Sequence, residues 1–225
     1  PVLSRGLGDV YKRQIQGEAG IVPAKKVFIN EIKKLCRKNN ALIVIDEVQS
    51  GVGRTGHLYA YEKYNIKPDI LCSAKGMGNG IPIGAILTTN KVAKAMQVGA
   101  HGSTYGGNPL ACSVSYEVFK EVSKKSFLNS VIKKEKLFIS LLSDLNKKYN
   151  CFTAVRSAGL WIGLELNSKI ENLTLQNIMS SAYDEGLMIL KANNNTLRLA
   201  PALTISEKEI KLGVKKLEKS LSRLL

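Results

Sequence analysis

The short apolar run ALIVID, at residues 41–46, constrains the fold of this chain more than any other segment. The run is rich in β-branched residues and too short for a helix, which is typical of a strand buried in a parallel sheet. It ends in an acidic residue, as a parallel strand often does at the functional edge of its sheet. An amphipathic helix is predicted before it, at residues 23–38, where apolar residues recur at three- and four-residue spacing from Val27 and Phe28 to Leu35. A helix that leads into a buried strand indicates an α/β fold.

The rest of the chain continues this alternation and then changes character. Further short strands are predicted at residues 68–74 and 84–88, with a glycine-rich turn between them. Beyond residue 110 the chain has longer, lysine-rich amphipathic helices, so we expect a domain boundary near that residue. The elements expected there are helices at about residues 110–125, 128–148 and 206–225, the last with a capping box of Ser206 and Glu209, and apolar runs at residues 159–166 and 197–200.

The composition excludes several classes of protein. Of the 225 residues, 44% are hydrophobic and 23% are charged, which suits a globular core and argues against intrinsic disorder. No repeat period or low-complexity tract indicates a solenoid or a collagen. The apolar runs are far shorter than the roughly 18 residues that a membrane span requires, and no apolar segment of a secretory signal is found at the start. We expect a cytoplasmic protein that does not cross a membrane.

The cysteines Cys36, Cys72, Cys112 and Cys151 stand far apart, without a CxxC pair, and the chain has only 2 histidines. This pattern does not predict a metal site. A chain with this hydrophobic content needs no disulfides, so we expect buried free thiols in a reducing compartment.

The chain carries 33 basic and 18 acidic residues, a formal net charge of +15, which raises the question of nucleic acid binding. The charge is mostly lysine spread along predicted helices, without interleaved aromatic residues or an arginine-rich arm. This pattern favours solvated helix faces over a nucleic acid groove, and it is compatible with small anionic substrates. The lysines in question are Lys124, Lys125, Lys133, Lys134, Lys136, Lys147, Lys148, Lys215, Lys216 and Lys219.

Two motifs match nucleotide-binding patterns, but each lacks the required context. GVGRTG, at residues 51–56, has the glycine spacing of a dinucleotide-binding loop, but it does not follow its strand directly and no acidic residue stands about 20 positions later. LIVIDE, at residues 42–47, resembles the magnesium-binding strand of nucleotide hydrolases, but no phosphate loop of the type GxxxxGK[ST] occurs in the chain.

A more coherent set combines an acid and a lysine at the ends of predicted strands. Asp46 ends one strand, and Lys75 ends the next, within a glycine-rich turn. From position alone, Lys75 is better explained as a solvated or salt-bridged lysine than as a catalytic one, and Asp46 could be a helix cap or a turn acid.

The neighbouring motifs change this balance. IQGEAG, LIVIDEVQSGVGRTG, KPDILCSAKGMGNGIPIGA and HGSTYGGNPLAC resemble, in this order, the successive signatures of the class III pyridoxal-phosphate aminotransferases, and the match runs from Ile15 to the end. Within that class, VGAHGSTYGGNPLAC, VRSAGLWIGLEL and TLRLAPALTIS are most similar to the enzymes that act on N-acetylornithine, with those acting on ornithine close to them.

The resemblance implies the carboxyl-terminal part of a fold type I transferase. Residues 15–110 would be the end of the large cofactor-binding domain, with part of its mixed or parallel sheet, and residues 111–225 the small α+β domain. The reaction implied is transfer of the ω-amino group of N-acetylornithine to 2-oxoglutarate, a step of arginine biosynthesis. Ornithine or another ω-amino acid is the alternative donor, and a non-catalytic basic binding module is a remote alternative from another class.

The resemblance also assigns roles around the cofactor, pyridoxal 5'-phosphate. Lys75 would carry it as a Schiff base and act as a general base. Asp46 would face the ring nitrogen and keep it protonated. Val48 would lie against a ring face, and Gln49 near the phenolic oxygen.

Other residues would bind the phosphate and the substrate. The resemblance implies that Ser103 and Thr104 reach the cofactor phosphate of a neighbouring subunit, and therefore a homodimer. Arg198 would bind a substrate carboxylate and pair with Glu18 of the QGE motif. That pair could act as a gate, closed for an ω-amino substrate and opened by 2-oxoglutarate.

Residues 1–14 depart from the family pattern, because Tyr11, Lys12 and Arg13 stand where the family has an apolar strand ending in Glu-Pro. We expect this segment to be foreign to the gene. The family's amino-terminal half, with its own phosphate and ring-stacking residues, is not found in the chain. We therefore expect residues 15–110 to expose apolar edges and the chain alone not to turn over.

Overall fold

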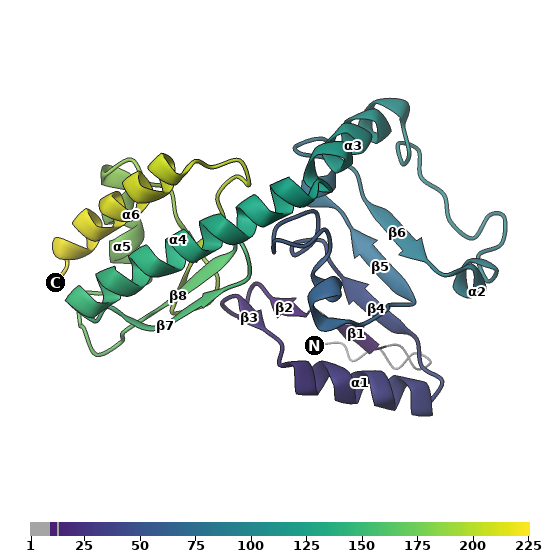
Figure 1. Ribbon diagram of the computed structural model, residues 1–225, viewed down its shortest axis with the longest axis horizontal. Helices are drawn as coiled ribbons and strands as arrows, with labels where there is room; N and C mark the ends of the chain where they lie inside the picture. The colour runs from purple at the N-terminus through teal and green to yellow at the C-terminus, as the bar shows by residue number, and fades with distance from the viewer. Residues whose placement is uncertain (1–9, 13) are drawn as a thin grey trace. The chain divides into compact units, whose positions relative to one another are not determined.

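The computed structural model describes residues 10–12 and 14–225 (Figure 1). These residues form two compact units. The first contains residues 10–12, Gln14, Ala24–Gly53 and His57–Phe127, and the second contains Ile15–Pro23, Arg54–Gly56 and Leu128–Leu225. The domain boundary near residue 110 stays a prediction. The foreign origin of residues 1–14 also stays a prediction, and residues 1–9 and 13 of that segment lie outside the described residues.

The first unit is built on a 4-stranded sheet with the order β1-β4-β5-β6. Strands β1, β4 and β5 are parallel, and β6 runs antiparallel to β5. The strands predicted at residues 41–46, 68–74 and 84–88 are confirmed as β4, β5 and β6, and the helix predicted at 23–38 is confirmed as α1. The elements are β1 (Val10–Lys12), α1 (Lys26–Lys38), β4 (Ile43–Asp46), η1 (Ala60–Tyr64), β5 (Ile70–Ser73), η2 (Lys75–Met77), β6 (Ala85–Thr88), α2 (Asn90–Ala93) and α3 (Pro109–Val122), η1 and η2 being 3₁₀ helices.

Strand β4 is buried at every position, as the continuous apolar run predicts. Helix α1 contributes Ile29 and Cys36 to the core of this unit, which also contains Ile43, Ile45 and Leu71 of the strands. Burial of such side chains, about 1.5–3 kcal/mol each, is the main force that holds helix and sheet together.

Only part of the apolar face of α1 is buried in the core of the first unit. Val27, Phe28 and Leu35, which helped to predict the helix, are 73%, 50% and 58% exposed. On the outer strand β6, Ile86 and Leu87 are also exposed. Apolar exposure in residues 15–110, expected from the sequence, is therefore observed.

The second unit is an antiparallel sheet with helices packed on it. Its 4-stranded sheet has the order β7-β8-β10-β9, and its core includes fully buried Leu142, Leu164, Leu197 and Leu217. The predicted last helix and its capping box are confirmed, since Ser206 Oγ accepts a hydrogen bond from Glu209 N and the Glu209 carboxylate accepts one from Ser206 N. The elements are β2 (Ile15–Gln16), β3 (Val22–Pro23), α4 (Lys125–Tyr149), β7 (Phe152–Ser157), β8 (Ile162–Leu166), α5 (Leu175–Asp184), β9 (Leu190–Lys191), β10 (Thr196–Leu199) and α6 (Glu207–Ser222).

The cysteines are free, as expected, but they are not all buried. Cys36 and Cys151 are buried, Cys72 is half-buried, and Cys112 is exposed. The expectation of burial is wrong for Cys112, because it lies on a part of helix α3 that nothing in the described chain covers.

Many of the lysines lie on exposed helix faces, and several of them form ion pairs. Lys148 of α4 contacts Glu218 of α6, and Lys133 contacts Glu207. Such exposed pairs contribute about 0–1 kcal/mol each. Within the described part of the chain, no helix combines the length and the apolar character needed to cross a bilayer.

Candidate active site

The predicted acid and lysine lie at the same edge of the first sheet. Asp46 is the last residue of β4, is 7% exposed and stands beside Cys72 of β5 in the parallel register. Lys75 follows the end of β5 directly after Ser73 and Ala74. Because the carboxyl ends of neighbouring parallel strands meet at one edge, the fold brings the ends of these two strands together.

The Asp46 carboxylate is oriented by its own turn. Its Oδ1 accepts a hydrogen bond from the backbone N–H of Val48 at 2.9 Å. This hydrogen bond is the turn role that the sequence left open, and it orients the side chain. Val48 and Gln49, which follow in the same turn, are half-buried.

Lys75 has an unusual backbone conformation and an exposed side chain. Its φ angle is +47°, in the left-handed region that side-chain-bearing residues rarely adopt. The next residue, Gly76, passes close to Val52, since a Cβ there would lie 3.3 Å from Val52 Cβ. Among the described residues no ion pair to Lys75 is found, so the salt-bridge alternative has no partner there. Strain of this kind, about 1–3 kcal/mol, persists where the surrounding structure imposes it.

Glu47, the last residue of the LIVIDE motif, anchors this edge, a role that the sequence did not indicate. It is fully buried, and its Oε1 accepts hydrogen bonds from Tyr61 N at 2.7 Å and Gln14 Nε2 at 3.0 Å. Its Oε2 accepts from Ala60 N at 2.9 Å and Ser50 Oγ at 2.8 Å. Burial raises the pKa of the Glu47 carboxyl, and these hydrogen bonds oppose the rise.

The residues at this edge fit the cofactor that the resemblance implies. A buried carboxylate that is already held by a backbone N–H suits the protonated nitrogen of a pyridine ring. An exposed lysine amine at the end of the next strand suits a carbonyl group. Val48 and Gln49, both half-buried in the turn after Asp46, offer the ring an apolar surface and a polar group. Within the described residues, no group of His, Cys, Asp and Glu has the arrangement of a metal site.

Ser103 and Thr104 lie elsewhere in the first unit, on the exposed connection between α2 and α3 (Figure 1). Ser103 Oγ accepts a hydrogen bond from Gly106 N at 2.9 Å, within its own turn. The loop ends at Asn108, which caps α3 by accepting a hydrogen bond from Ala111 N. The structure places these hydroxyls on the surface and does not bring them to Asp46 or Lys75.

In the second unit, the structure brings Glu18 and Arg198 together. Arg198 Nη1 donates to Glu18 Oε1 at 3.0 Å, and the side chains are 20% and 61% exposed for Arg198 and Glu18. Arg198 lies on β10, and Glu18 lies in the turn between β2 and β3. The pair predicted from the resemblance is thus a contact of the fold.

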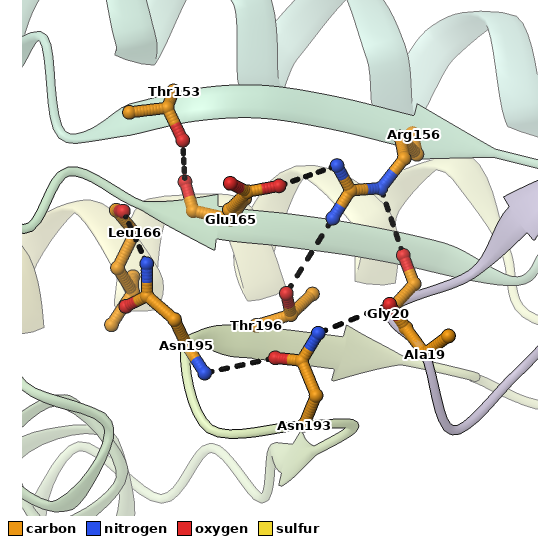
Figure 2. A network of polar contacts seen from close by, with 9 residues as sticks. All are labelled: Ala19, Gly20, Thr153, Arg156, Glu165, Leu166, Asn193, Asn195 and Thr196. Carbon is orange, nitrogen blue, oxygen red and sulfur yellow. Dashed lines mark hydrogen bonds and ion pairs between the residues drawn. The ribbon is translucent and has the colours of Figure 1, made fainter.

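Figure 2 shows a polar network in the same unit that the sequence analysis did not identify. Arg156 of β7 donates to Gly20 O and to the carboxylate of Glu165, and it lies within hydrogen-bond distance of Thr196 Oγ1. The segment VRSAGLWIGLEL contains both charged residues, but nothing in that segment alone indicates that they meet the loop at Gly20.

The glycine-rich segment 51–56 has a packing role. Gly51 lies against Tyr59, since a Cβ there would be 2.8 Å from the ring. Arg54 Nη1 donates to Leu160 O at 2.8 Å and Pro201 O at 2.6 Å, and burial lowers the pKa of Arg54 to about 10. These contacts account for the motif without a dinucleotide.

Comparisons with known proteins agree with one another. A family model described as "Aminotransferase class-III" matches residues 13–221. The chain is 48% identical over 216 residues to an acetylornithine/succinyldiaminopimelate aminotransferase of Buchnera aphidicola, covering 96% of this chain and 53% of that protein. It is 45% identical over 208 residues to a succinylornithine transaminase of Yersinia pseudotuberculosis, covering 92% of this chain and 50% of that protein.

A solved structure supports the same relationship. The crystal structure of N-acetylornithine aminotransferase from Stenotrophomonas maltophilia superposes with a TM-score of 0.87 at 33% identity, covering 96% of this chain and 56% of that chain. The chain therefore spans about half the length of the relatives that it matches.

Proposed function

The chain belongs to the class-III aminotransferase family, and from this premise we propose that it forms the carboxyl-terminal half of an enzyme that transfers the ω-amino group of N-acetylornithine to 2-oxoglutarate. The observation that carries the proposal is the placement of Asp46 and Lys75 at the ends of neighbouring parallel strands. A carboxylate and an amine at one sheet edge are the groups that this chemistry requires.

The family's cofactor, pyridoxal phosphate, supplies an electron sink for the carbanion that the substrate forms. In this proposal the Asp46 carboxylate accepts a hydrogen bond from the protonated ring nitrogen and keeps the proton there. Lys75 Nζ would hold the cofactor and would serve as the general base that takes a proton from the amine-bearing carbon of the substrate. The side chains of Val48 and Gln49 hold the ring in place.

Arg198 is proposed to bind the carboxylate of the 2-oxo acid, because a guanidinium matches a carboxylate with two parallel hydrogen bonds. Glu18 occupies it when no such group is present, so the ω-amino donor binds without competition from its own carboxylate. The acceptor must displace Glu18, which makes the pair a gate between the two half-reactions.

The assembly of the enzyme and its place in the cell are also part of the proposal. Ser103 and Thr104 are proposed to reach the cofactor phosphate of a second subunit, since their loop is exposed and glycine-rich. The enzyme would then be a homodimer, acting in the cytoplasm in arginine biosynthesis.

A related amino donor is the second candidate. The Yersinia pseudotuberculosis relative is named a succinylornithine transaminase, and the Buchnera aphidicola relative is also named for succinyldiaminopimelate. These names favour a donor with an acylated α-amino group, and free ornithine is the remaining alternative.

The proposal is tested by measuring glutamate formation from 2-oxoglutarate with N-acetylornithine, N-succinylornithine or ornithine as donor. The chain is assayed alone and after co-expression with the amino-terminal half of the Buchnera aphidicola relative, with Lys75→Ala as the control. We expect no turnover by the chain alone, and Lys75-dependent turnover, fastest with N-acetylornithine, in the assembled enzyme. Turnover that survives Lys75→Ala would refute the proposal.

A further inference from the structure

We infer that Arg156 is a positioning residue that holds the loop of Glu18 against the second sheet, and so sets how readily Arg198 is released to a substrate carboxylate. The inference rests on the proposed function of Arg198 and Glu18. It concerns contacts within one compact unit, since all of these residues belong to the second.

Glu18 lies in a tight turn between the short strands β2 and β3. The turn is closed by hydrogen bonds from Gly20 N and Ile21 N to Gly17 O, at 3.1 and 3.2 Å. Gly20 and Ile21 both have positive φ angles, +103° and +54°. Such a turn moves as one piece, so a contact that fixes Gly20 also fixes the backbone that carries Glu18.

Arg156 makes that contact. Its Nε donates to Gly20 O at 2.9 Å, with the side chain coming from near the end of β7 (Figure 2). The guanidinium is oriented from its other side by Glu165 of β8, whose Oε2 lies 2.5 Å from Nη1. Thr196 Oγ1, on fully buried Thr196 of β10, lies 3.5 Å from Nη2. The planar group is therefore held by neighbouring strands while it binds the loop.

The register of the sheet explains why the contact between Arg156 and Gly20 lies close to Arg198. Gly163 of β8 is the direct neighbour of both Arg156 on β7 and Arg198 on β10. The loop passes over it, since a Cβ on Gly163 would lie 2.5 Å from Gly20 O. Glycine at this position allows the backbone of the loop to approach the sheet between the two arginines.

A second contact holds Ala19, the residue before Gly20 in the loop. Asn193 Nδ2 donates to Ala19 O at 3.0 Å, and Asn193 Oδ1 accepts from Asn195 N at 2.8 Å (Figure 2). The carbonyl groups of Ala19 and Gly20, directly after Glu18, are thus held by a side chain of the β9–β10 loop and by a side chain of β7. Glu18 itself is 61% exposed and needs this support to stay on Arg198.

The contact from Arg156 depends on the shape of the guanidinium as well as on its charge. An arginine presents several N–H groups in one plane, whereas a lysine concentrates its charge on one flexible amine. A lysine at position 156 could still pair with Glu165, but it could not also donate from the Nε position to Gly20 O. Loss of that bond frees the turn, and Glu18 then competes less well with a carboxylate for Arg198.

The effect of Arg156 on the pair of Glu18 and Arg198 is tested first by nuclear magnetic resonance of the 225-residue chain, without any ligand. The Nε–Hε resonance of Arg198 is compared in the unaltered chain, Glu18→Gln, Arg156→Met, Arg156→Lys and the control Lys148→Met, which breaks an exposed ion pair elsewhere in the unit. We expect both Arg156 variants to shift the resonance toward its position in Glu18→Gln, and Lys148→Met to leave it unchanged. A resonance that stays in place in Arg156→Met overturns the inference, as does an Arg156→Lys variant identical to the unaltered chain.

A titration with glutarate then measures the consequence. We expect glutarate to bind roughly two- to fivefold more tightly to Arg156→Met and to Glu18→Gln than to the unaltered chain, the size expected for loss of an exposed competing ion pair. The double variant should gain no more than either single variant. Gains that add up would mean that Arg156 acts independently of Glu18, and would overturn the inference.

The same experiment separates this inference from the proposed function. If Arg198→Ala and Glu18→Gln leave glutarate binding unchanged while Arg156→Met still moves the Arg198 resonance, the carboxylate role fails and the positioning contact stands. If Glu18→Gln tightens glutarate binding and Arg156→Met does not, the positioning role fails alone. Circular dichroism of each variant verifies that it is folded.

Discussion

Replacing Glu47 by alanine should destabilise the first unit strongly, because its carboxylate is the acceptor for buried donors. Without it, the backbone N–H groups of Ala60 and Tyr61 lose their partner. Each buried donor left without an acceptor costs about 1–3 kcal/mol.

We therefore expect Glu47→Ala to lower the free energy of unfolding by about 2–5 kcal/mol, allowing for partial access of water. This is a large part of the roughly 5–15 kcal/mol that stabilises a typical domain. Urea unfolding followed by circular dichroism measures the loss, and hydrogen exchange at Ala60 and Tyr61 locates it. Glu31→Ala, which removes an exposed carboxylate from α1, is the matched control and should change stability by less than about 0.5 kcal/mol. A loss below about 1 kcal/mol in Glu47→Ala would refute the reasoning.

The pH dependence of the same site has a definite sign. Burial raises the pKa of Glu47 above its ordinary value of 4.5, so the folded chain holds this proton more tightly than the unfolded chain. Its contribution to stability is fully present below the unfolded pKa and is lost as the pH rises through the folded pKa. Relative to Glu47→Gln, which does not titrate, the unaltered chain should thus be more stable at pH 4 than at pH 7. A stability difference between the two chains that is independent of pH over this range would contradict the raised pKa.

Substitutions at three further positions test the packing and the cap of α6. Gly163→Ala should destabilise the second unit and move the Glu18 turn, because the added Cβ would lie 2.5 Å from Gly20 O; unchanged hydrogen exchange at Gly20 would contradict this. Leu142→Ala, at a fully buried position of α4, should cost about 2–5 kcal/mol in urea unfolding, and a cost under about 1 kcal/mol would mean that the site is not packed as described. Ser206→Ala should cost about 1 kcal/mol through loss of the cap of α6, while Ser206→Thr should retain most of the stability.

The elements that the sequence predicts well are those whose signals are local. Strand β4 follows from a run of apolar β-branched residues, and α6 from its spacing and its capping box. Strand β7 and helix α5 were not predicted. Strand β7 contains Thr153 and Arg156 among its apolar residues, and only one of its residues is fully buried. Helix α5 has apolar residues at helical spacing, at Leu175, Ile178 and Ala182, and Thr174 caps its start, so its local pattern would have allowed the prediction.

The candidate site divides in the same way. Position alone left the roles of Asp46 and Lys75 open, and the roles proposed for them rest on the resemblance of the neighbouring motifs to the family. The role of Glu47 could not be predicted, because its partners Ala60 and Tyr61 return to it through a loop whose path no local pattern gives. Arg156 meets Gly20 across 136 positions of the sequence. A contact of that range depends on the register of the sheet, which the sequence alone does not specify.

Lys75 is proposed to be the lysine that binds the cofactor. The most direct measurement adds pyridoxal phosphate at less than one equivalent to the chain, reduces the mixture with borohydride and maps the labelled peptides. Lys75→Ala and Lys91→Ala, the latter an exposed lysine of the same unit, are treated in parallel. We expect a label that is concentrated on Lys75, lost in Lys75→Ala and retained in Lys91→Ala. A label spread evenly over the surface lysines, and unchanged in Lys75→Ala, would contradict it.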